Sequence, residues 1–325
     1  MRGASGRSRQ RGVALLTAIL IVALGTILAA SLSYENVLTA RRAQATFAFD
    51  QSLLIAEGGE ALAAYALRAT RQSSPQQVYP GQVWSMPYGP VEIVPEVTLQ
   101  ASLEDMSGRF NLNDLVDASG VINPATLGIF ENLLENLGLE PKWAAQIADW
   151  IDADSVAYGP DGAEDATYLS QIPPYRTPNV QITSTSELLA LAGFGRDRYL
   201  KLAPYVAALP QGTRINLCTA SGPVLDALLG AGIRQFSSLS AQTFANNRAE
   251  GCWPRKSDFD ASLNGNQQAQ QAVDAWIAET SDYFRLTSIV SIGTTQFALY
   301  SLLHMENQGN GGLKVHTIQR AFTPD

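Results

Sequence analysis

The chain has 325 residues, of which 46% are hydrophobic and 16% are charged, and its formal net charge is −8. This composition fits a globular body with room for more than one domain and excludes a wholly disordered chain. The negative charge disfavours extensive binding to nucleic acids or anionic headgroups, because both carry charge of the same sign.

The first predicted element is an uncharged apolar segment from Val13 to Leu32. As a helix it would be about 30 Å long, enough to cross the hydrocarbon core of a membrane. Four arginines and no acidic residue precede it, so the positive-inside rule predicts a cytoplasmic N-terminus and an exported body. A signal peptide cleaved near Ala29 to Ser31 is the alternative. The apolar pattern continues without a proline, which favours one helix from about Val13 to about Arg68.

The step from Gly12 to Val13-Ala14-Leu15-Leu16 resembles the cleavage site of type IV prepilins and pseudopilins. The resemblance implies that the leader is cut after Gly12, that Val13 becomes an N-methylated terminus, and that the apolar helix is retained. Typical members carry Glu five residues after the cut, where this chain has Thr17. A buried carboxylate is tolerated when it faces an opposite charge, which the family's Glu is thought to find on a neighbouring subunit. A subunit without it can stand first, at the tip, as is typical of minor pseudopilin K of type II secretion systems.

Strand patterns lie on either side of the middle of the chain. Val91 to Leu103 alternates apolar and polar residues, with Pro95 confined to an edge, a bulge or a turn. Three further strand patterns, at about 283–292, 295–305 and 313–322, predict a meander near the C-terminus. Together these strands form a small antiparallel sheet that can pack on the long helix.

The residues that follow the first strand give a second resemblance. Asp105 to Asn113 reads Asp-Met-Ser-Gly-Arg-Phe-Asn-Leu-Asn, which is similar to the pseudopilin K segment where a helical insertion interrupts the sheet. The middle of the chain, from about Asp114 to Ile277, is mostly helical by pattern. Pro124 to Leu137 follows Asn123 as an N-cap, and Pro141 to Ile151 carries apolar residues four apart.

A candidate helix-hairpin-helix lies at Ser186 to Leu200, with a Gly-hydrophobic-Gly turn. In DNA-binding proteins such a hairpin points backbone N–H groups at a phosphate. A type IV pilus minor subunit or DNA-uptake subunit is therefore the alternative function. The mixed charges of the hairpin and the acidic chain favour a packing role.

Six carboxylates and no Lys or Arg lie between Asp149 and Asp165. Their mutual repulsion would destabilise the loop unless it is fully solvated or a cation binds there. Ca²⁺ takes six to eight oxygen ligands, although the spacing differs from the helix-loop-helix Ca²⁺ loop. The resemblance implies Ca²⁺ binding, because pseudopilin K members share the Asp-Trp-Ile-Asp-x-Asp and Gly-Ala-Glu-Asp segments. The candidate ligands are Asp149, Asp152, Asp154, Asp161, Glu164 and Asp165.

Cys218 and Cys252 are the two cysteines of the chain. In an exported protein a disulfide between them is the first expectation, and two buried thiols are the alternative. A zinc site is disfavoured, since His304 and His316 are distant in sequence. The segment from Asn246 to Ala272 is rich in Asn, Gln and Ser, and we expect a loop braced by Cys252.

These observations predict an α+β fold in which a pilin-like long N-terminal helix packs on a small antiparallel sheet, with a large all-helical insertion domain. The predicted divisions are a prepilin leader at 1–12, a transmembrane part of the helix at 13–33, a pseudopilin α/β core at 34–112 and 278–325, and the insertion domain at 113–277. The chain contains no recognisable catalytic motif, and paired carboxylates without a substrate-binding constellation do not indicate glycoside hydrolysis. A non-enzymatic role follows.

The resemblance implies a minor pseudopilin that caps the pseudopilus tip and helps to initiate its assembly for protein export. The implied partners are other minor pseudopilins, the major pseudopilin, the prepilin peptidase and the inner-membrane assembly platform, with no nucleic acid. The implied location is the inner membrane, with one span, a cytoplasmic N-terminus and a periplasmic body. A plain membrane-anchored scaffold is a further alternative.

Overall fold

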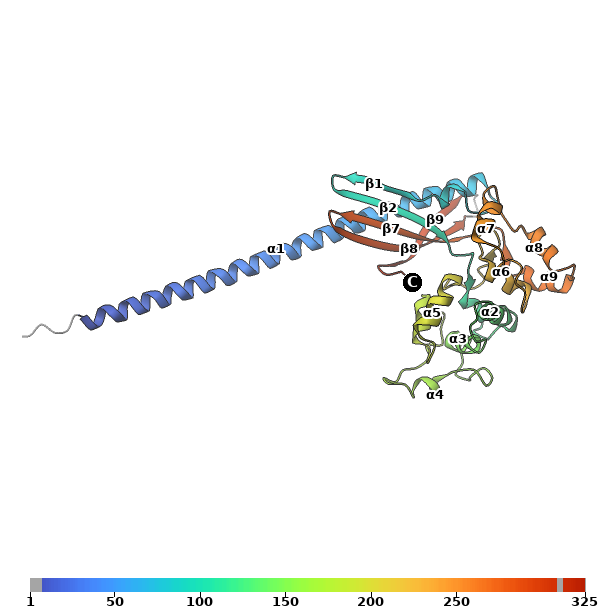
Figure 1. Cartoon of the computed structure of the whole chain (residues 1–325), viewed down its shortest axis with the longest axis horizontal. Helices are drawn as coiled ribbons and strands as arrows, with labels where there is room; N and C mark the ends of the chain where they lie inside the picture. Colours follow the sequence, from blue (N-terminus) through green and yellow to red (C-terminus); the bar gives the residue numbers. More distant parts are fainter. Residues whose placement is uncertain (1–7, 309–311, 325) are drawn as a thin grey trace, which may run out of the picture. The chain divides into compact units, whose positions relative to one another are not determined.

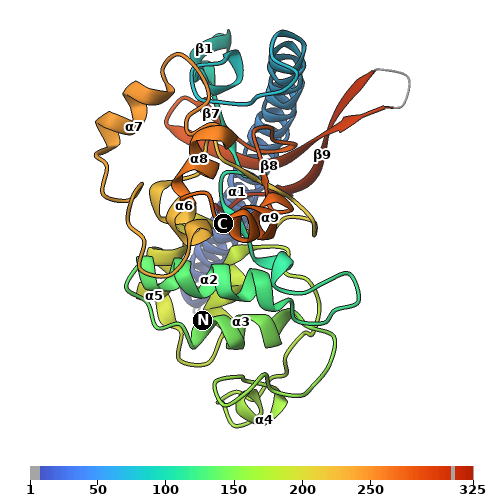
Figure 2. The same ribbon diagram turned by 90° about the vertical axis from the view of Figure 1, so that its right-hand side faces the viewer.

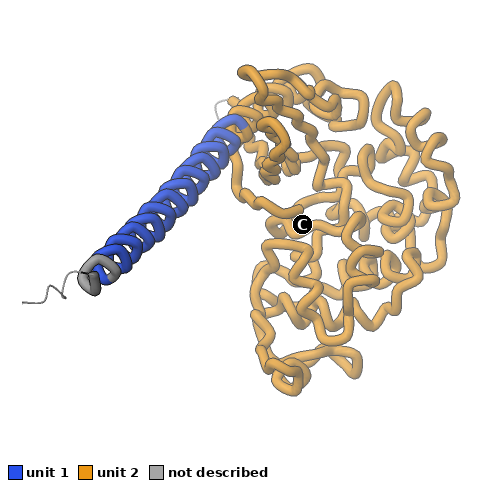
Figure 3. The backbone as a smooth tube through the Cα atoms, turned by 60° about the vertical axis from the view of Figure 1, so that its left-hand side comes forward, with its two compact units in different colours: residues 1–55 blue, residues 56–325 orange. Residues whose placement is uncertain are grey.

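The computed structural model describes residues 8–308 and 312–324, so residues 1–7 of the expected leader lie outside the described residues. The α-helices are α1 (Ser8–Ser73), α2 (Pro124–Asn136), α3 (Trp143–Ile151), α4 (Asp165–Tyr168), α5 (Gly195–Leu202), α6 (Gly222–Leu229), α7 (Ala241–Arg248), α8 (Lys256–Ser262) and α9 (Gln267–Asp274). The 3-10 helices are η1 (Val83–Ser85), η2 (Leu112–Leu115), η3 (Thr185–Ala190) and η4 (Ala203–Tyr205). The strands are β1 (Tyr88–Val94), β2 (Val97–Asp105), β3 (Phe110–Asn111), β4 (Val206–Ala207), β5 (Ile215–Asn216), β6 (Ile277–Ala278), β7 (Tyr283–Ile292), β8 (Thr295–Asn307) and β9 (Leu313–Ala321). The chain divides into two compact units, residues 1–55 and 56–325 (Figure 3).

Helix α1 is one uninterrupted helix, as the sequence predicts (Figure 1). Its N-terminal part is long and apolar enough to cross a membrane. Every large apolar side chain between Val13 and Leu32 is more than half exposed in the structure. Because so much apolar surface is unfavourable in water, this stretch requires lipid or another protein around it.

The main sheet has five antiparallel strands in the order β1-β2-β7-β8-β9. The expected strand from Val91 to Leu103 is a hairpin: β1 and β2 are joined by a tight turn at Pro95 and Glu96, and Glu96 has a φ of 66°. The C-terminal meander is confirmed as β7, β8 and β9. The sheet is interrupted between β2 and β7 by the helical body, residues 106–282.

The C-terminal part of α1, from Ala56 on, packs on one face of this sheet. Ala63 and Leu67 are buried with Phe284 of β7 and Leu303 of β8. In both strands apolar residues alternate with more polar ones, and every second side chain faces the helix. The apolar side chains of β7 and β8 therefore meet α1.

An ion pair fixes the helix to the far strands of the sheet. Arg320 of β9 donates from Nε and Nη2 to the two carboxylate oxygens of Glu60, each at 2.8 Å. Ser301 and Thr317 donate to the same carboxylate. Burial raises the pKa of Glu60, but these hydrogen bonds outweigh it and hold the pKa below its ordinary value.

The helical body has its own core, in which α2 packs against α3 and α6 (Figure 2). Phe130, Leu133 and Leu134 of α2 are fully buried there. Asn123 caps α2, with its side chain accepting from the backbone N–H of Ala125, as expected. Two short parallel strand pairs, β3 with β4 and β5 with β6, also lie in this body, and the prediction of a mostly helical middle did not include them.

A buried polar junction joins the body to the sheet. Asp105, at the end of β2, accepts hydrogen bonds from Asn216, Thr219, Ser281 and the backbone N–H of Ser107. Burial raises the pKa of Asp105 despite these four donors. Since the partners come from separate segments, the junction holds the body at a fixed place on the sheet.

The prediction of a loop from Asn246 to Ala272 is wrong. The structure has the helices α7, α8 and α9 over much of this stretch. Ser240 and Asn266 cap α7 and α9 through their side chains. These helices are only seven or eight residues long and mostly polar, so each offers too few apolar residues to be recognised as a helix from the sequence. The disulfide between Cys218 and Cys252 is present.

Candidate metal centre

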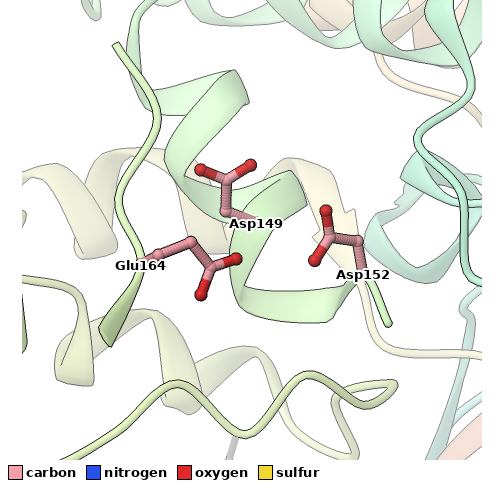
Figure 4. A group of neighbouring side chains, drawn as sticks. All are labelled: Asp149, Asp152 and Glu164. Atoms are coloured by element: carbon pink, nitrogen blue, oxygen red, sulfur yellow. The ribbon is translucent and has the colours of Figure 1, made fainter. Parts of the chain in front are cut away.

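Three buried carboxylates from the acidic loop converge at the C-terminal end of α3 (Figure 4). Asp149 lies on α3, Asp152 caps its end, and Glu164 immediately precedes α4. Their ligand atoms lie within 4.8 Å of one another, and their side chains are at most 5% exposed. Since residues three apart on a helix share a face, the spacing of Asp149 and Asp152 brings both to one side.

The loop between Asp152 and Glu164 folds back onto Asp149. The backbone N–H of Ala163 donates to Asp149 Oδ2 at 2.7 Å, and that of Tyr158 donates to the same carboxylate at 3.1 Å. Gly162 allows this close approach, because a Cβ there would collide with Asp149 Oδ2 and with the backbone of Tyr158.

The centre retains oxygen atoms that lack a partner. Asp152 Oδ1 and Glu164 Oε1 are buried and accept no hydrogen bond from the described residues. A buried carboxylate oxygen without a donor or cation is strongly unfavourable. The two unpaired oxygens therefore fit a bound cation.

The electrostatics of the centre support the same conclusion. Burial raises the pKa of Asp149 to about 6, and the nearby charges of Glu164 and Asp154 add to the rise. Burial, together with the charges of Asp154, Asp149 and Glu164, raises the pKa of Asp152 to about 7. Burial also raises the pKa of Glu164. A divalent cation would reverse these shifts by favouring the charged forms.

The other three candidate ligands lie outside this group: Asp154 and Asp161 are on the loop, and Asp165 begins α4. Asp165 forms an ion pair with Arg176, and Asp154 accepts from the backbone N–H of Val156 at 2.7 Å. Asp161 is exposed. The structure thus brings together Asp149, Asp152 and Glu164, with Asp154 close enough for its charge to raise the pKa of all three.

Two residues that the sequence did not indicate complete the surroundings. Thr177 donates to Glu164 Oε2 at 2.9 Å. Asn179 donates to the backbone carbonyl of Asp154, while its own buried Oδ1 accepts no hydrogen bond from the described residues. Both follow α4 by several residues in a segment without regular structure, so no sequence spacing links them to the acidic loop.

The oxygen-only donor set indicates a hard cation. Carboxylates without His or Cys suit Ca²⁺ or Mg²⁺, and an irregular loop suits Ca²⁺, because Mg²⁺ demands near-ideal octahedral geometry. The residues described above as surrounding these carboxylates include neither a nucleophile nor a group that would hold a substrate. The arrangement can therefore hold the loop on α3 through a cation.

The expected helix-hairpin-helix is the 3-10 helix η3 followed by α5. Two of its cations contact the body: Arg198 lies over the ring of Trp143 and 3.4 Å from Glu140, and Lys201 donates to the backbone carbonyl of Gly138. Through these contacts the hairpin packs against the helical body, which is the role that the sequence analysis favoured over phosphate binding.

A long helix with an apolar N-terminal segment and a C-terminal part packed on an antiparallel sheet, together with a helical body inserted into that sheet, defines a membrane-anchored subunit of the pilin-like class. The model of the family described as "Type II secretion system (T2SS), protein K" matches residues 108–211, a range that includes the three carboxylates. The chain is 34% identical to type II secretion system protein K of Pseudomonas aeruginosa over 93% of this chain and 91% of that one. It is 32% identical to the protein K of Pectobacterium carotovorum over 97% of each chain.

The fold is also found in a solved structure, that of the GspK-GspI-GspJ complex from the type 2 secretion system of enterotoxigenic Escherichia coli. The TM-score is 0.72 and the identity is 22%, with 87% of this chain and all of the other covered. This chain belongs to the type II secretion system protein K family and is a minor pseudopilin. The relatives do not favour the alternative of a DNA-uptake subunit.

Proposed function

We propose that this minor pseudopilin caps the tip of the pseudopilus and helps to start its assembly. The observation that carries the proposal is the helical body inserted between β2 and β7, which adds a second core beside the sheet. A body of this size would obstruct a further subunit stacking above it. Thr17 also supports a position at the tip. Its hydroxyl donates to the backbone carbonyl of Ala14 at 3.0 Å, so this residue needs no charged group from a neighbouring subunit.

The tip position can be tested by electron microscopy of overproduced pseudopili that carry an epitope-tagged copy of this chain. Gold-labelled antibody should mark one end of each fibre. Label distributed along the fibres would contradict a capping role, and so would fibres of normal number in a strain without the chain.

The partners we propose are other minor pseudopilins, the major pseudopilin, the prepilin peptidase and the inner-membrane assembly platform. The solved neighbour, which contains GspK together with GspI and GspJ, supports the first of these. The major pseudopilin, the prepilin peptidase and the assembly platform are proposed because a pseudopilus subunit must be processed and assembled. The role requires no catalysis, and we propose that the chain is not an enzyme.

We propose that α1 anchors the chain in the inner membrane before assembly, with a cytoplasmic N-terminus and a periplasmic body. The exposed apolar side chains between Val13 and Leu32 support the anchor, and the four leader arginines support the orientation. Cleavage after Gly12 and methylation of Val13 belong to the same proposal. The retained helix then becomes the part that joins the fibre.

We propose that Ca²⁺ is the cation at the centre formed by Asp149, Asp152 and Glu164. The unpaired buried oxygens and the raised pKa values of Asp149 and Asp152 support a cation, and the irregular loop supports Ca²⁺ over Mg²⁺. The ion would neutralise the three carboxylates and keep the loop folded onto α3. Calorimetric titration of chelator-treated protein should show binding of Ca²⁺ at lower concentration than Mg²⁺, and equal affinity for both would contradict the assignment.

A further inference from the structure

The two histidines of the chain lie opposite each other in the main sheet. His304 on β8 pairs with His316 on β9 in the antiparallel register. Side chains at directly opposite positions lie on the same face, with Cβ atoms about 4.5–5.5 Å apart. Distance in sequence argues against a zinc site that combines the histidines with the cysteines, and it does not separate the histidines from each other. The fold therefore creates a pair of imidazoles that the sequence alone does not show.

The pair lies on the face of the sheet opposite to α1. Leu303 and Met305, the neighbours of His304 on β8, are buried with residues of the helix, and successive side chains of a strand point to opposite faces. On its own face His304 lines a cavity of about 360 Å³. The other charged residues that line this cavity are Arg214 and Asp282, whose charges are opposite. A hydrated cation can therefore approach His304 through a space whose walls carry no net charge.

The ring nitrogens of the pair lack other partners. Nδ1 of His316 is buried and forms no hydrogen bond with the described residues. The ring of His304 contacts Tyr283 and His316, and no described residue hydrogen-bonds to its nitrogens. A buried polar atom without a partner is unfavourable. A metal ion bound to these nitrogens would supply the missing interaction.

The geometry of the pair fits two ligands of one tetrahedral ion. The ring centroids of His304 and His316 are 5.4 Å apart, and the ring planes make an angle of 71°. In a tetrahedral zinc site the Zn–N bond is about 2.0–2.1 Å long and the ring centre lies about 1.2 Å beyond the nitrogen, so two bound rings have centroids about 5.3 Å apart. The observed separation agrees with this value.

Tyr283 fixes the orientation of one of the two rings. It lies opposite His304 on β7, and the two rings are nearly parallel, with an angle of 8° and a centroid distance of 4.6 Å. Groups that orient a metal ligand from behind are a common part of metal sites. The row of Tyr283, His304 and His316 across three strands therefore holds the pair in place before an ion binds.

The donor atoms determine the kind of ion. Imidazole nitrogen suits Zn²⁺ and other divalent transition metals, whereas Ca²⁺ and Mg²⁺ prefer oxygen. Among the described residues, Asp149, Asp152 and Glu164 form the one group of three or more His, Cys, Asp or Glu side chains with converging ligand atoms. A third side chain of these types therefore does not reach the histidine pair within the described part of the chain, and water would complete the coordination.

We propose that His304 and His316 together bind one Zn²⁺ ion, whose remaining positions are filled by water. The ion would cross-link β8 to β9, which forms one edge of the sheet (Figure 2). Strand β9 carries Arg320, which pairs with Glu60 of α1. The ion would thus hold in place the strand that fixes the long helix to the sheet.

The first test is calorimetric titration of Zn²⁺ into the full-length chain in detergent, without a polyhistidine tag and with Ca²⁺ present to saturate the carboxylate centre. One Zn²⁺ per chain is expected, and His304→Gln and His316→Gln should each weaken its binding at least tenfold. Asp152→Asn is the matched control, since it removes a carboxylate of the other centre and should leave the affinity for Zn²⁺ unchanged. Equal affinity in His316→Gln and the unsubstituted chain would overturn the proposal, and so would a loss of binding that is confined to Asp152→Asn.

Folding of the variants is checked by their melting temperatures, which also give a second readout. Zn²⁺ should raise the melting temperature of the unsubstituted chain and leave that of His316→Gln unchanged; an equal rise in both would mean that the ion binds elsewhere and would overturn the proposal. A third measurement needs no variant. Pulsed electron paramagnetic resonance of the chain loaded with one Cu²⁺ should detect the remote ring nitrogens of two bound imidazoles, and a spectrum without imidazole nitrogen would contradict the site.

Discussion

Removal of the cation from the candidate metal centre should lower the stability of the chain at neutral pH. Two carboxylates 4.8 Å apart repel each other by about 3.5 kcal/mol at an effective dielectric constant of 20. The rise in the pKa of Asp149 to about 6 corresponds to about 3 kcal/mol between its two protonation states. A saturating cation should recover a similar amount, since ligand at one hundred times its Kd contributes about 2.7 kcal/mol.

The assay is the melting temperature of the full-length protein in detergent, with CaCl₂ or with a chelator. With an unfolding entropy of about 2.1 cal/mol/K per residue, 3 kcal/mol corresponds to a shift of roughly 4 to 5 °C for a chain of 325 residues. Asp152→Asn should raise the melting temperature without the ion, because it removes one of the three charges, and should cut the gain from Ca²⁺ by more than half. Asp161→Asn is the matched control, since Asp161 is exposed on the same loop and should leave the gain intact.

The pH dependence provides an independent check of the same reasoning. A carboxyl group with a raised pKa in the folded state binds its proton more tightly than in the unfolded chain, so stability without the ion falls as pH rises from about 4 to about 7. Ca²⁺ should remove this decline. No change on chelation at pH 7, or an equal gain in Asp152→Asn, would refute the reasoning.

Three further predictions concern the loop, the ion pair and the disulfide. Gly162→Ala should lower the stability with Ca²⁺ by about 1 to 3 kcal/mol and weaken Ca²⁺ binding in calorimetry, because the new Cβ displaces the loop from Asp149; Gly128→Ala, which has open space on α2, should do neither. Glu60→Gln should cost about 1 to 2 kcal/mol in denaturant titrations at pH 7. Because the pKa of Glu60 is lower in the folded chain than in the unfolded chain, its ionised carboxylate stabilises the fold at pH values above the unfolded pKa, and this contribution is lost as pH falls below about 4.5. Glu60→Gln should therefore lose less stability on acidification than the unsubstituted chain does. The same dependence of stability on acid pH in both proteins would contradict the ion pair. Replacing both Cys218 and Cys252 by Ser should lower the free energy of unfolding by about 3 to 4 kcal/mol. An equal denaturation midpoint for this variant and the unsubstituted chain would show that the disulfide does not stabilise the fold.

The elements with a long, consistent apolar pattern could be predicted from the sequence. Helix α1 has a continuous apolar segment and no proline, and the strands β7 to β9 alternate apolar and polar residues. Helices α7 to α9 were missed because they are short and mostly polar, although Ser240 and Asn266 cap α7 and α9 locally. In α7, Arg248 also donates to the carbonyls of Leu217 and Ala220, and contacts with residues so distant in sequence leave no local pattern.

The candidate metal centre was predicted with six ligands, of which the structure brings three together. Charge density and the resemblance to pseudopilin K pointed to six carboxylates, and the path of the loop decides which of them meet. Gly162 lets the loop close on Asp149, while Arg176 pairs with Asp165 from outside the loop. Thr177 reaches Glu164 in the same way, which only the folded chain reveals.

The central claim is that the apolar segment of α1 survives processing and joins the chain to the membrane and then to the fibre. Mass spectrometry of the protein recovered from cells with an active prepilin peptidase tests it most directly. We predict a first residue Val13 that carries an N-methyl group, with the whole of α1 from that residue retained. A mature chain that begins near Ser31 would contradict the account, because the stalk would then be absent.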